Sequence, residues 1–171
     1  MTRRLANLNE LSASNRPKYN PNAYGTGIVH LGVGSFHKAH QAYYTDKILE
    51  KSGGDWRIMG VSLRSNDAQN QLRPQNGLYT LLIKGGMGTT SRVIGSIVDV
   101  LSASKNSEPA IQAMVNKNIK IVSLTVTEKA YGLNLSNLGC NINHADIAYD
   151  LKNFHSPRGV LGIVTKALAI R

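Results

Sequence analysis

The chain has 171 residues, of which 42% are hydrophobic and 18% charged, so it suits one globular domain with a sizeable core. Its formal net charge of +10 comes from scattered basic residues without a recognised nucleic-acid motif. A solvated basic surface, attraction for phosphorylated cofactors or an acidic partner segment explains this charge, and these three explanations are preferred to nucleic-acid binding, which we do not expect.

The sequence gives no sign of a membrane or secretory protein. No apolar run approaches the roughly 18 residues that a membrane span needs, and the basic N-terminus lacks the apolar stretch of a secretory signal. The single cysteine, Cys140, cannot form an internal disulfide. We therefore expect a cytoplasmic protein.

The first half of the chain predicts an arm and then a β-α-β unit. Residues 1–26 are polar and turn-rich, and we expect them to lead into a domain over residues 27–171. Ile28–Leu31 is a β-prone run, and residues 56–63 read as a second strand after Gly53-Gly54. Between them a helix is expected, with Asp46 as an unexplained polar exception on its apolar stripe. That stripe comprises Phe36, Ala39, Ala42, Tyr43 and Leu49.

The second half predicts a hairpin, two helices and another strand. Leu78–Lys84 and Arg92–Val100 flank a glycine-rich turn, which favours a hairpin added to the parallel sheet. Ser107 is expected to cap a helix, and residues 119–127 form the most strand-like stretch. Residues 134–143 look irregular. A last helix is expected after Ser156-Pro157 with the apolar stripe Val160, Leu161, Val164, Ala167 and Leu168.

The turn Gly32-Val33-Gly34 is the main chemical signal. A strand that turns on glycines into a helix leaves backbone N–H groups and the positive helix end free for a pyrophosphate. Gly32 would allow the tight turn and Gly34 the close approach of phosphates, whereas His37 occupies the third glycine position of the usual fingerprint. An ordinary turn is the competing interpretation.

Two further segments are candidates for cofactor contacts. Asp67 follows the second predicted strand and would accept hydrogen bonds from ribose hydroxyls, which favours NAD over NADP, whereas Arg64 could hold a 2′-phosphate. Thr125, Thr127 and Glu128 end a predicted core strand, where ligands of open α/β sheets bind, so they could line the nicotinamide-ribose side. A solvated loop and a β-branched strand explain the two segments equally well.

Three other motifs favour structural interpretations. His37 and His40 form an H-x-x-H pair, but no third ligand accompanies them, so packing is preferred to metal binding. Cys140 has no evident catalytic partner. Residues 134–136 fit a glycosylation sequon, which without a signal peptide is interpreted as accidental.

Five segments in order closely resemble the mannitol dehydrogenase family of long-chain polyol dehydrogenases, which includes the fructuronate and tagaturonate reductases. These segments are IVHLGVGSFHKAHQAYYTDKIL, DWRIMGVSLR, NGLYTLL, RVIGSI and IVSLTVTEKAYG. The resemblance covers about Ile28 to Arg171. It implies that Gly32, Gly34, Ser35 and Phe36 bind the NAD pyrophosphate, and that a histidine at position 37 is usual.

The resemblance also implies a doubly wound, mainly parallel Rossmann-type α/β fold with an antiparallel hairpin. In that family the catalytic lysine lies in a C-terminal helical domain, which we expect to be absent here. The chain is therefore expected to be the NAD-binding domain of an oxidoreductase for a polyol or sugar acid, of the mannitol/fructose or mannonate/fructuronate type, and inactive alone. The alternative is a non-catalytic NAD-binding or regulatory module, and self-association is also expected.

Overall fold

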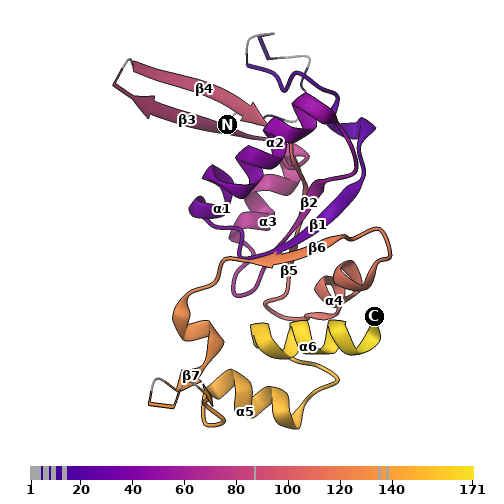
Figure 1. Cartoon of the computed structure of the whole chain (residues 1–171), viewed down its shortest axis with the longest axis vertical. Coiled ribbons are helices and arrows are strands. Elements are labelled where there is room, and N and C mark those ends of the chain that lie inside the picture. The colour runs from indigo at the N-terminus through magenta and orange to yellow at the C-terminus, as the bar shows by residue number, and fades with distance from the viewer. Residues whose placement is uncertain are drawn as a thin grey trace.

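The computed structural model describes residues 5, 8, 11–12, 15–86, 88–134, 136–137 and 139–171. Its centre is a sheet of four parallel strands in the order β5-β2-β1-β6 (Figure 1). These strands are β1 (Thr26–Leu31), β2 (Arg57–Ser62), β5 (Ile97–Ser102) and β6 (Ile121–Leu124). The predicted doubly wound, mainly parallel fold is thereby confirmed. None of the described helices is long and apolar enough to cross a membrane.

The strand order places the switch in winding direction between β1 and β6. Counted along the chain, the strands are arranged third, second, first, fourth, which is how the first four strands of a dinucleotide-binding sheet are arranged. The register pairs His30 with Ser123 and Leu31 with Leu124, so the carboxyl ends of the two strands coincide. Ligands of such sheets bind at this point.

Each face of the sheet has its own core, because successive strand residues point to opposite faces. Ile28 and Ile58 pack on one face with Ala42 and Leu72, which lie in α2 (Gln41–Ser52) and α3 (Asp67–Leu72). On the other face lies a second buried cluster supplied by the sheet, α4 (Glu108–Val115) and α6 (Val160–Ile170). Its members include Val29, Leu31, Ile111, Met114, Val160 and Ile163.

The single helix expected after the glycine turn is two helices. The first is α1 (Ser35–Ala39), which ends at His40, where the backbone leaves the helical region (φ −116°, ψ −90°) before α2 begins. This break sends Phe36 outward, with 64% of its surface exposed, while Ala42 and Leu49 are buried. The expectation that Phe36 belongs to the buried stripe was wrong.

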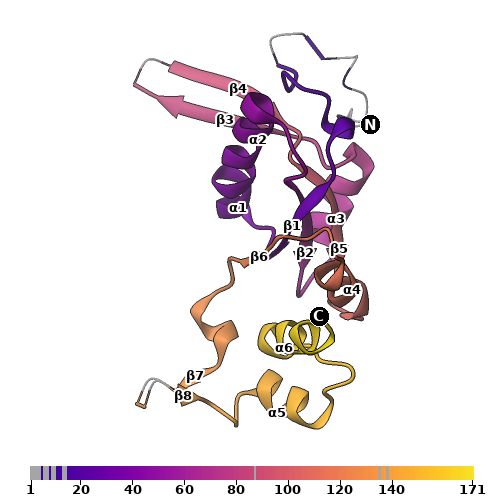
Figure 2. The ribbon, with the colours of Figure 1, turned by 45° about the vertical axis from the view of Figure 1, so that its right-hand side comes forward.

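The predicted hairpin exists but is a separate sheet, formed by β3 (Tyr79–Gly85) and β4 (Gly88–Ile94). It projects away from the four-stranded sheet (Figure 2). The extended segment expected over Arg92–Val100 divides at Gly95-Ser96, and its second part is β5, which pairs in parallel with β2. The expectation that the whole segment belongs to the hairpin was wrong.

The C-terminal third is more ordered than its sequence suggested. The residues expected to be irregular contain a short ladder of β7 (Leu133–Asn134) and β8 (Gly139–Cys140), and α5 (Ala145–Lys152) follows. Short 3₁₀ turns η2 (Pro21–Ala23), η3 (Arg73–Gln75) and η4 (Glu128–Tyr131) complete the described elements. The helix after Ser107 is confirmed as α4, but Ser107 makes no capping bond, because its hydroxyl donates to the Pro157 carbonyl.

Candidate cofactor site

The glycine turn at the end of β1 has a geometry that requires glycine at its first position. Gly32 has φ +103°, and a Cβ there would lie 2.2 Å from the carbonyl oxygen of Thr125. Its N–H donates to the Val61 carbonyl (2.8 Å), and its own carbonyl accepts from the Gly34 N–H (2.9 Å). The turn is therefore tied to both neighbouring strands and closes tightly.

Gly34 has open space where a side chain would point. A Cβ at Gly34 would meet no heavy atom within 4 Å, although the backbone there is extended and imposes no positive φ. The next three residues begin α1, and within the described part of the chain the N–H groups of Ser35, Phe36 and His37 donate to no protein acceptor. Open space beside free amides at a helix start fits a phosphate group.

His37 takes the place of the third glycine of the dinucleotide fingerprint and packs α1 against the sheet. Its ring is fully buried and stacks on the ring of His30, with centroids 3.6 Å apart and planes 11° apart. In the usual fingerprint a glycine lets the helix approach the strand closely. Here a flat imidazole pair fills the gap between helix and strand.

Both buried histidines are neutral near pH 7. Burial lowers the pKa of His30 from its ordinary value to about 4, because a charged ring at this buried position would lack the solvation that water provides. Burial lowers the pKa of His37 to about 3, and repulsion by a charged His30 adds to that shift. Neither ring nitrogen of His37 has a hydrogen-bond partner among the described residues, which only a neutral ring tolerates at low cost.

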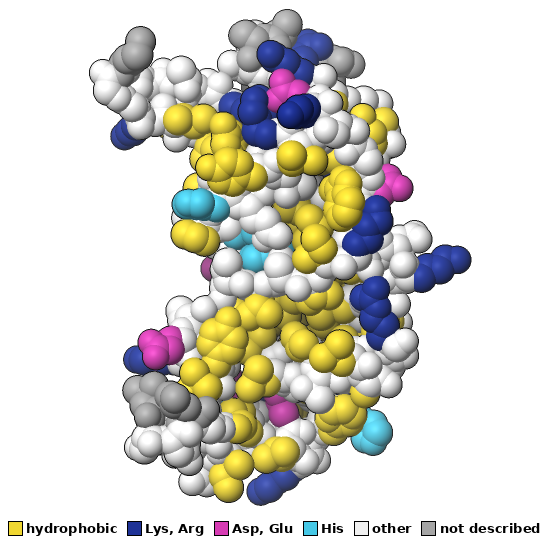
Figure 3. Space-filling view, viewed as in Figure 1, with side chains coloured by type: hydrophobic (Ala, Val, Ile, Leu, Met, Phe, Trp, Pro, Cys, Tyr) yellow, Lys and Arg dark blue, Asp and Glu magenta, His cyan; other side chains and the backbone are white. Residues whose placement is uncertain are grey.

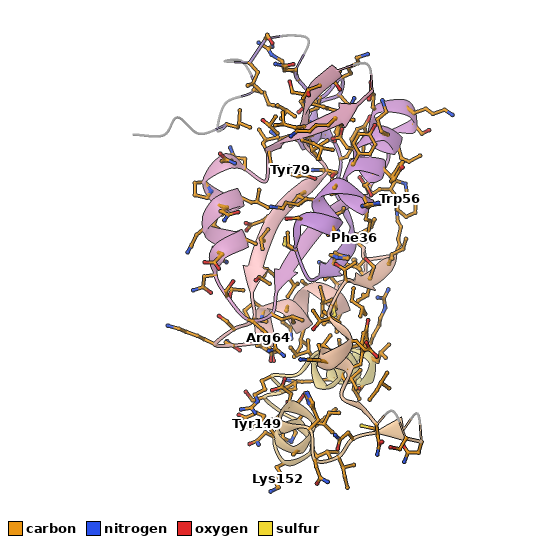
Figure 4. All side chains as sticks on the ribbon, turned by 90° about the vertical axis from the view of Figure 1, so that its left-hand side faces the viewer. Phe36, Trp56, Arg64, Tyr79, Tyr149 and Lys152 are labelled. Carbon is orange, nitrogen blue, oxygen red and sulfur yellow. The ribbon has the colours of Figure 1, made fainter. Side chains whose placement is uncertain are left out.

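A hollow of about 320 Å³ lies beside the ends of β2 and β5. Arg64 and Ser104 line it from the sheet side, and Asp146 and Arg158 line it from the segment after β6. Asp146 lies 3.6 Å from the Arg64 guanidinium and 3.1 Å from that of Arg158. Figure 4 shows Arg64 at the end of the sheet that faces α5, the helix that carries Tyr149.

The residues singled out from the sequence do not all converge. Thr125 reaches the glycine turn, where its hydroxyl donates to the Gly32 carbonyl (2.9 Å). Asp67 is the first residue of α3, is exposed, and is not among the residues that line the 320 Å³ hollow. Thr127 and Glu128 are exposed at the start of η4, and Glu128 lines a different hollow of about 390 Å³ beside Leu133 and His144.

The histidine pair, Cys140 and the sequon, which we interpreted as structural or accidental, do not form a common site among the described residues. His37 stacks on His30, whereas His40 is exposed and stacks on Phe36, with centroids 4.3 Å apart. Among the described residues no three histidine, cysteine or acidic side chains gather as metal ligands. Cys140 is exposed and unpaired by disulfide. Residue 135 of the sequon lies outside the described residues.

Several residues of this region carried no signal in the sequence. Asp146 in α5 and Arg158 in the connection between α5 and α6 reach the hollow although they are distant from Arg64 along the chain. His30 and Gln41 are joined to β6 by side-chain hydrogen bonds. The only local hint was the polar His30 inside a β-prone apolar run. A histidine in a buried strand indicates a polar partner on the neighbouring strand.

A parallel sheet with its winding switch beside a glycine turn and free helix amides defines a dinucleotide-binding domain. The comparisons with known proteins narrow that class. The chain belongs to the mannitol dehydrogenase family, because the model of the mannitol dehydrogenase Rossmann domain matches residues 26–171.

Similar proteins agree with this membership. A mannitol 2-dehydrogenase of Pyrenophora tritici-repentis is 41% identical over 168 residues, which cover 96% of this chain and 30% of that protein. The structure of Pseudomonas fluorescens mannitol 2-dehydrogenase in a ternary complex with NAD and D-mannitol is 40% identical, with a TM-score of 0.89 over 97% of this chain and 35% of that one. A substrate-free D-sorbitol dehydrogenase is 36% identical, with a TM-score of 0.86 over 92% of this chain and 33% of that one.

These coverages show that the chain spans about a third of the length of the relatives it matches. Family membership supports a nicotinamide cofactor for this fold.

Proposed function

We propose that this chain is the NAD-binding part of an oxidoreductase that transfers hydride between a nicotinamide cofactor and a polyol or sugar acid. The substrate would be of the mannitol/fructose or mannonate/fructuronate type. The observation that carries the proposal is the open space at Gly34 beside the free amides of α1, at the winding switch of the sheet. The similar structure with NAD and D-mannitol bound, at 40% identity, supports both the cofactor and the substrate class.

Each candidate residue has a physical role in this proposal. The N–H groups of Ser35 and Phe36 would donate to the pyrophosphate over Gly34, while Gly32 holds the turn. Thr125, Thr127 and Glu128 would line the nicotinamide-ribose side, since they follow β6 at the carboxyl edge of the sheet. When bound, the cofactor supplies or accepts the hydride at C4 of its nicotinamide ring.

NAD is preferred to NADP in this proposal because of the charges near the ends of β2 and β5. Asp67 lies exposed in the first turn of α3, where its carboxylate would repel a 2′-phosphate and accept hydrogen bonds from ribose hydroxyls. Arg64 is the residue that would favour NADP, but its guanidinium lies 3.6 Å from Asp146. That neighbour reduces the positive charge available to a phosphate.

We expect little or no turnover by this chain alone. The family resemblance places the general base for polyol oxidation on a lysine in a later, mostly helical domain, which also supplies most substrate contacts. Oxidation of mannitol or reduction of fructuronate by the purified chain at ordinary enzymatic rates would contradict this part of the proposal.

Calorimetric titration with NAD and with NADP tests the cofactor site directly. We expect NAD to bind the wild-type chain and the variant Gly34→Leu to lose that binding, because the leucine would fill the phosphate space. Gly85→Leu is the matched control, since Gly85 also faces open space without a positive φ but lies in the hairpin. Equal binding by both variants, or tighter binding of NADP than of NAD, would contradict the proposal.

A further inference from the structure

His30 links the central strand to the glycine turn through side chains of β6. The ring is 1% exposed and lies two residues before Gly32. Its Nδ1 is 2.8 Å from the Ser123 hydroxyl, and its Nε2 is 2.9 Å from the Thr125 hydroxyl. Both ring nitrogens are therefore engaged by side chains of the neighbouring parallel strand or its end.

The direction of each of these hydrogen bonds follows from the Gly32 carbonyl, to which Thr125 is also bonded. The Gly32 carbonyl can only accept, so the Thr125 hydroxyl donates its single proton to that oxygen (2.9 Å). Thr125 must then accept from His30, which places the ring proton on Nε2. The Nδ1 atom of the neutral ring is thereby an acceptor for the Ser123 hydroxyl.

The series begins at α2. Ser123 Oγ, whose proton is committed to His30, accepts from the Gln41 amide nitrogen (3.0 Å), so the nearby Gln41 carbonyl oxygen (3.2 Å) receives no proton from it. A continuous set of directed bonds thus runs from Gln41 through Ser123, His30 and Thr125 to the Gly32 carbonyl. The three inner members, Ser123, His30 and Thr125, both donate and accept, and such networks polarise and reinforce their bonds.

The Gly32 carbonyl is the atom on which the phosphate turn depends. It accepts from Thr125 on one side and from the Gly34 N–H on the other, both at 2.9 Å. Rotation of this peptide group would break both bonds and move Gly34, whose open side is the candidate phosphate space. The orientation of the Gly32 peptide therefore sets the position of the α1 amides.

We propose that His30 is a positioning residue of the cofactor site, which holds the glycine turn in its phosphate-binding form through the Nε2–H tautomer and Thr125. This inference rests on the proposed cofactor function and assigns the turn's orientation to a side chain that is too deeply buried to touch the cofactor. His37, stacked over the same ring, covers one face of it.

Substitutions at His30 distinguish the roles of its two ring nitrogens. A glutamine amide reaches the position of Nε2 and can still donate to Thr125, whereas an asparagine amide reaches only the position of Nδ1. We expect His30→Asn to raise the Kd for NAD about tenfold through loss of a buried hydrogen bond and loosening of the turn, and His30→Gln to remain within about threefold of wild type. Thr125→Val should behave like His30→Asn if the asparagine variant does not fold.

A destabilised control separates positioning from general loss of stability. Ile111→Val lies in the core on the opposite face of the sheet and should lower the free energy of unfolding by about 1 kcal/mol, without changing the Kd. Wild-type affinity in His30→Asn, or equally poor binding by the glutamine and asparagine variants, would overturn the inference.

Nitrogen-15 NMR of the imidazole gives a readout that does not need the cofactor. We expect the Nε2–H tautomer in the wild-type chain and a shifted Gly34 amide resonance in His30→Asn but not in His30→Gln. An Nδ1–H tautomer would overturn the inference. Should the wild-type chain bind no NAD, the proposed function fails, and these resonances still decide whether His30 holds the turn.

Discussion

The two stacked histidines have different environments and therefore different consequences. His30 is hydrogen-bonded at both ring nitrogens, whereas the ring nitrogens of His37 have no partner among the described residues. His37 contributes a flat, neutral ring that fills the gap between α1 and β1. Its contribution to folding is consequently one of shape, and it depends on the ring's remaining uncharged.

The lowered pKa values of both rings predict how acid affects the free energy of unfolding. In the unfolded chain a histidine has an ordinary pKa near 6.5, whereas the folded values are about 3 for His37 and about 4 for His30. The unfolded chain therefore binds protons that the folded chain does not. The stability that depends on neutral rings is fully present above pH 6.5 and is lost as the pH falls toward 4.

The variant His37→Phe tests that dependence. Phenylalanine keeps a flat ring but cannot titrate, so the free energy of unfolding at pH 7 should change by no more than about 1.5 kcal/mol. Between pH 6.5 and pH 4 the variant should lose less stability than wild type, as measured by urea denaturation. His155→Phe, at an exposed position, is the control and should leave the pH slope unchanged; an unchanged slope in His37→Phe as well would contradict the assignment.

At the level of single residues, the sequence could identify the groups that local geometry requires. Gly32 and Gly34 were identifiable because a strand, a glycine turn and a helix adjoin along the chain, and their observed geometry fits that role. His30 was not identifiable, because its partners Ser123 and Thr125 lie 93 and 95 residues away. Side-chain networks between parallel strands have no local period in the sequence.

At the level of elements, Asp46 explains how the hairpin is fixed to the domain. This carboxylate, the polar exception on the stripe of α2, is fully buried. One oxygen accepts from Arg92 of β4 (2.7 Å), and the other accepts from the Tyr19 hydroxyl (2.6 Å) and the Gly95 N–H (2.9 Å). A single buried charge thus joins α2, the base of the hairpin and the segment that precedes β1.

Removing the cation from this pair should be costly. Arg92→Met leaves Asp46 buried without its counter-ion, which we expect to lower the free energy of unfolding by about 3–5 kcal/mol. Arg73→Met is the matched control, because the Arg73–Asp99 pair (2.8 Å) is partly exposed; its loss should cost less than about 1 kcal/mol. Urea denaturation measures both values, and losses of equal size would refute the structural role of Asp46.

The boundaries of elements were less predictable than their existence. The expected extended run over Arg92–Val100 divides because the Gly95 N–H binds Asp46 and the Ser96 hydroxyl donates to the Ala42 carbonyl. Apolar residues occur on all sides of α6, so the sequence could not show which side of the helix faces the core. Ile163 is buried there, whereas Leu161 and Leu168, expected on the buried stripe, are 40% and 69% exposed.

At the level of the whole molecule, the described surface is strongly apolar around β6, α5 and α6. Figure 3 shows hydrophobic side chains gathered over the lower half of this face. A groove of about 460 Å³ between α5 and α6 is lined by Leu151, Phe154 and Leu161 among others. Beside it, β6 pairs only with β1 among the described strands and exposes Ile121 (43%) and Val122 (36%).

This combination predicts self-association of the purified chain. A sheet edge with unpaired backbone groups and apolar side chains is a template for pairing with another strand, and proteins usually protect such edges with charges. We expect the mean mass measured by light scattering to rise with concentration, and Val122→Lys to keep the chain monomeric by placing a charge at this edge. Ser52→Lys adds the same charge at the exposed end of α2, far from β6 along the chain, and should associate like wild type. A wild-type chain that stays monomeric at high concentration would contradict this prediction. Equal association in both lysine variants would place the contact elsewhere, with the α5–α6 groove as the next surface to substitute.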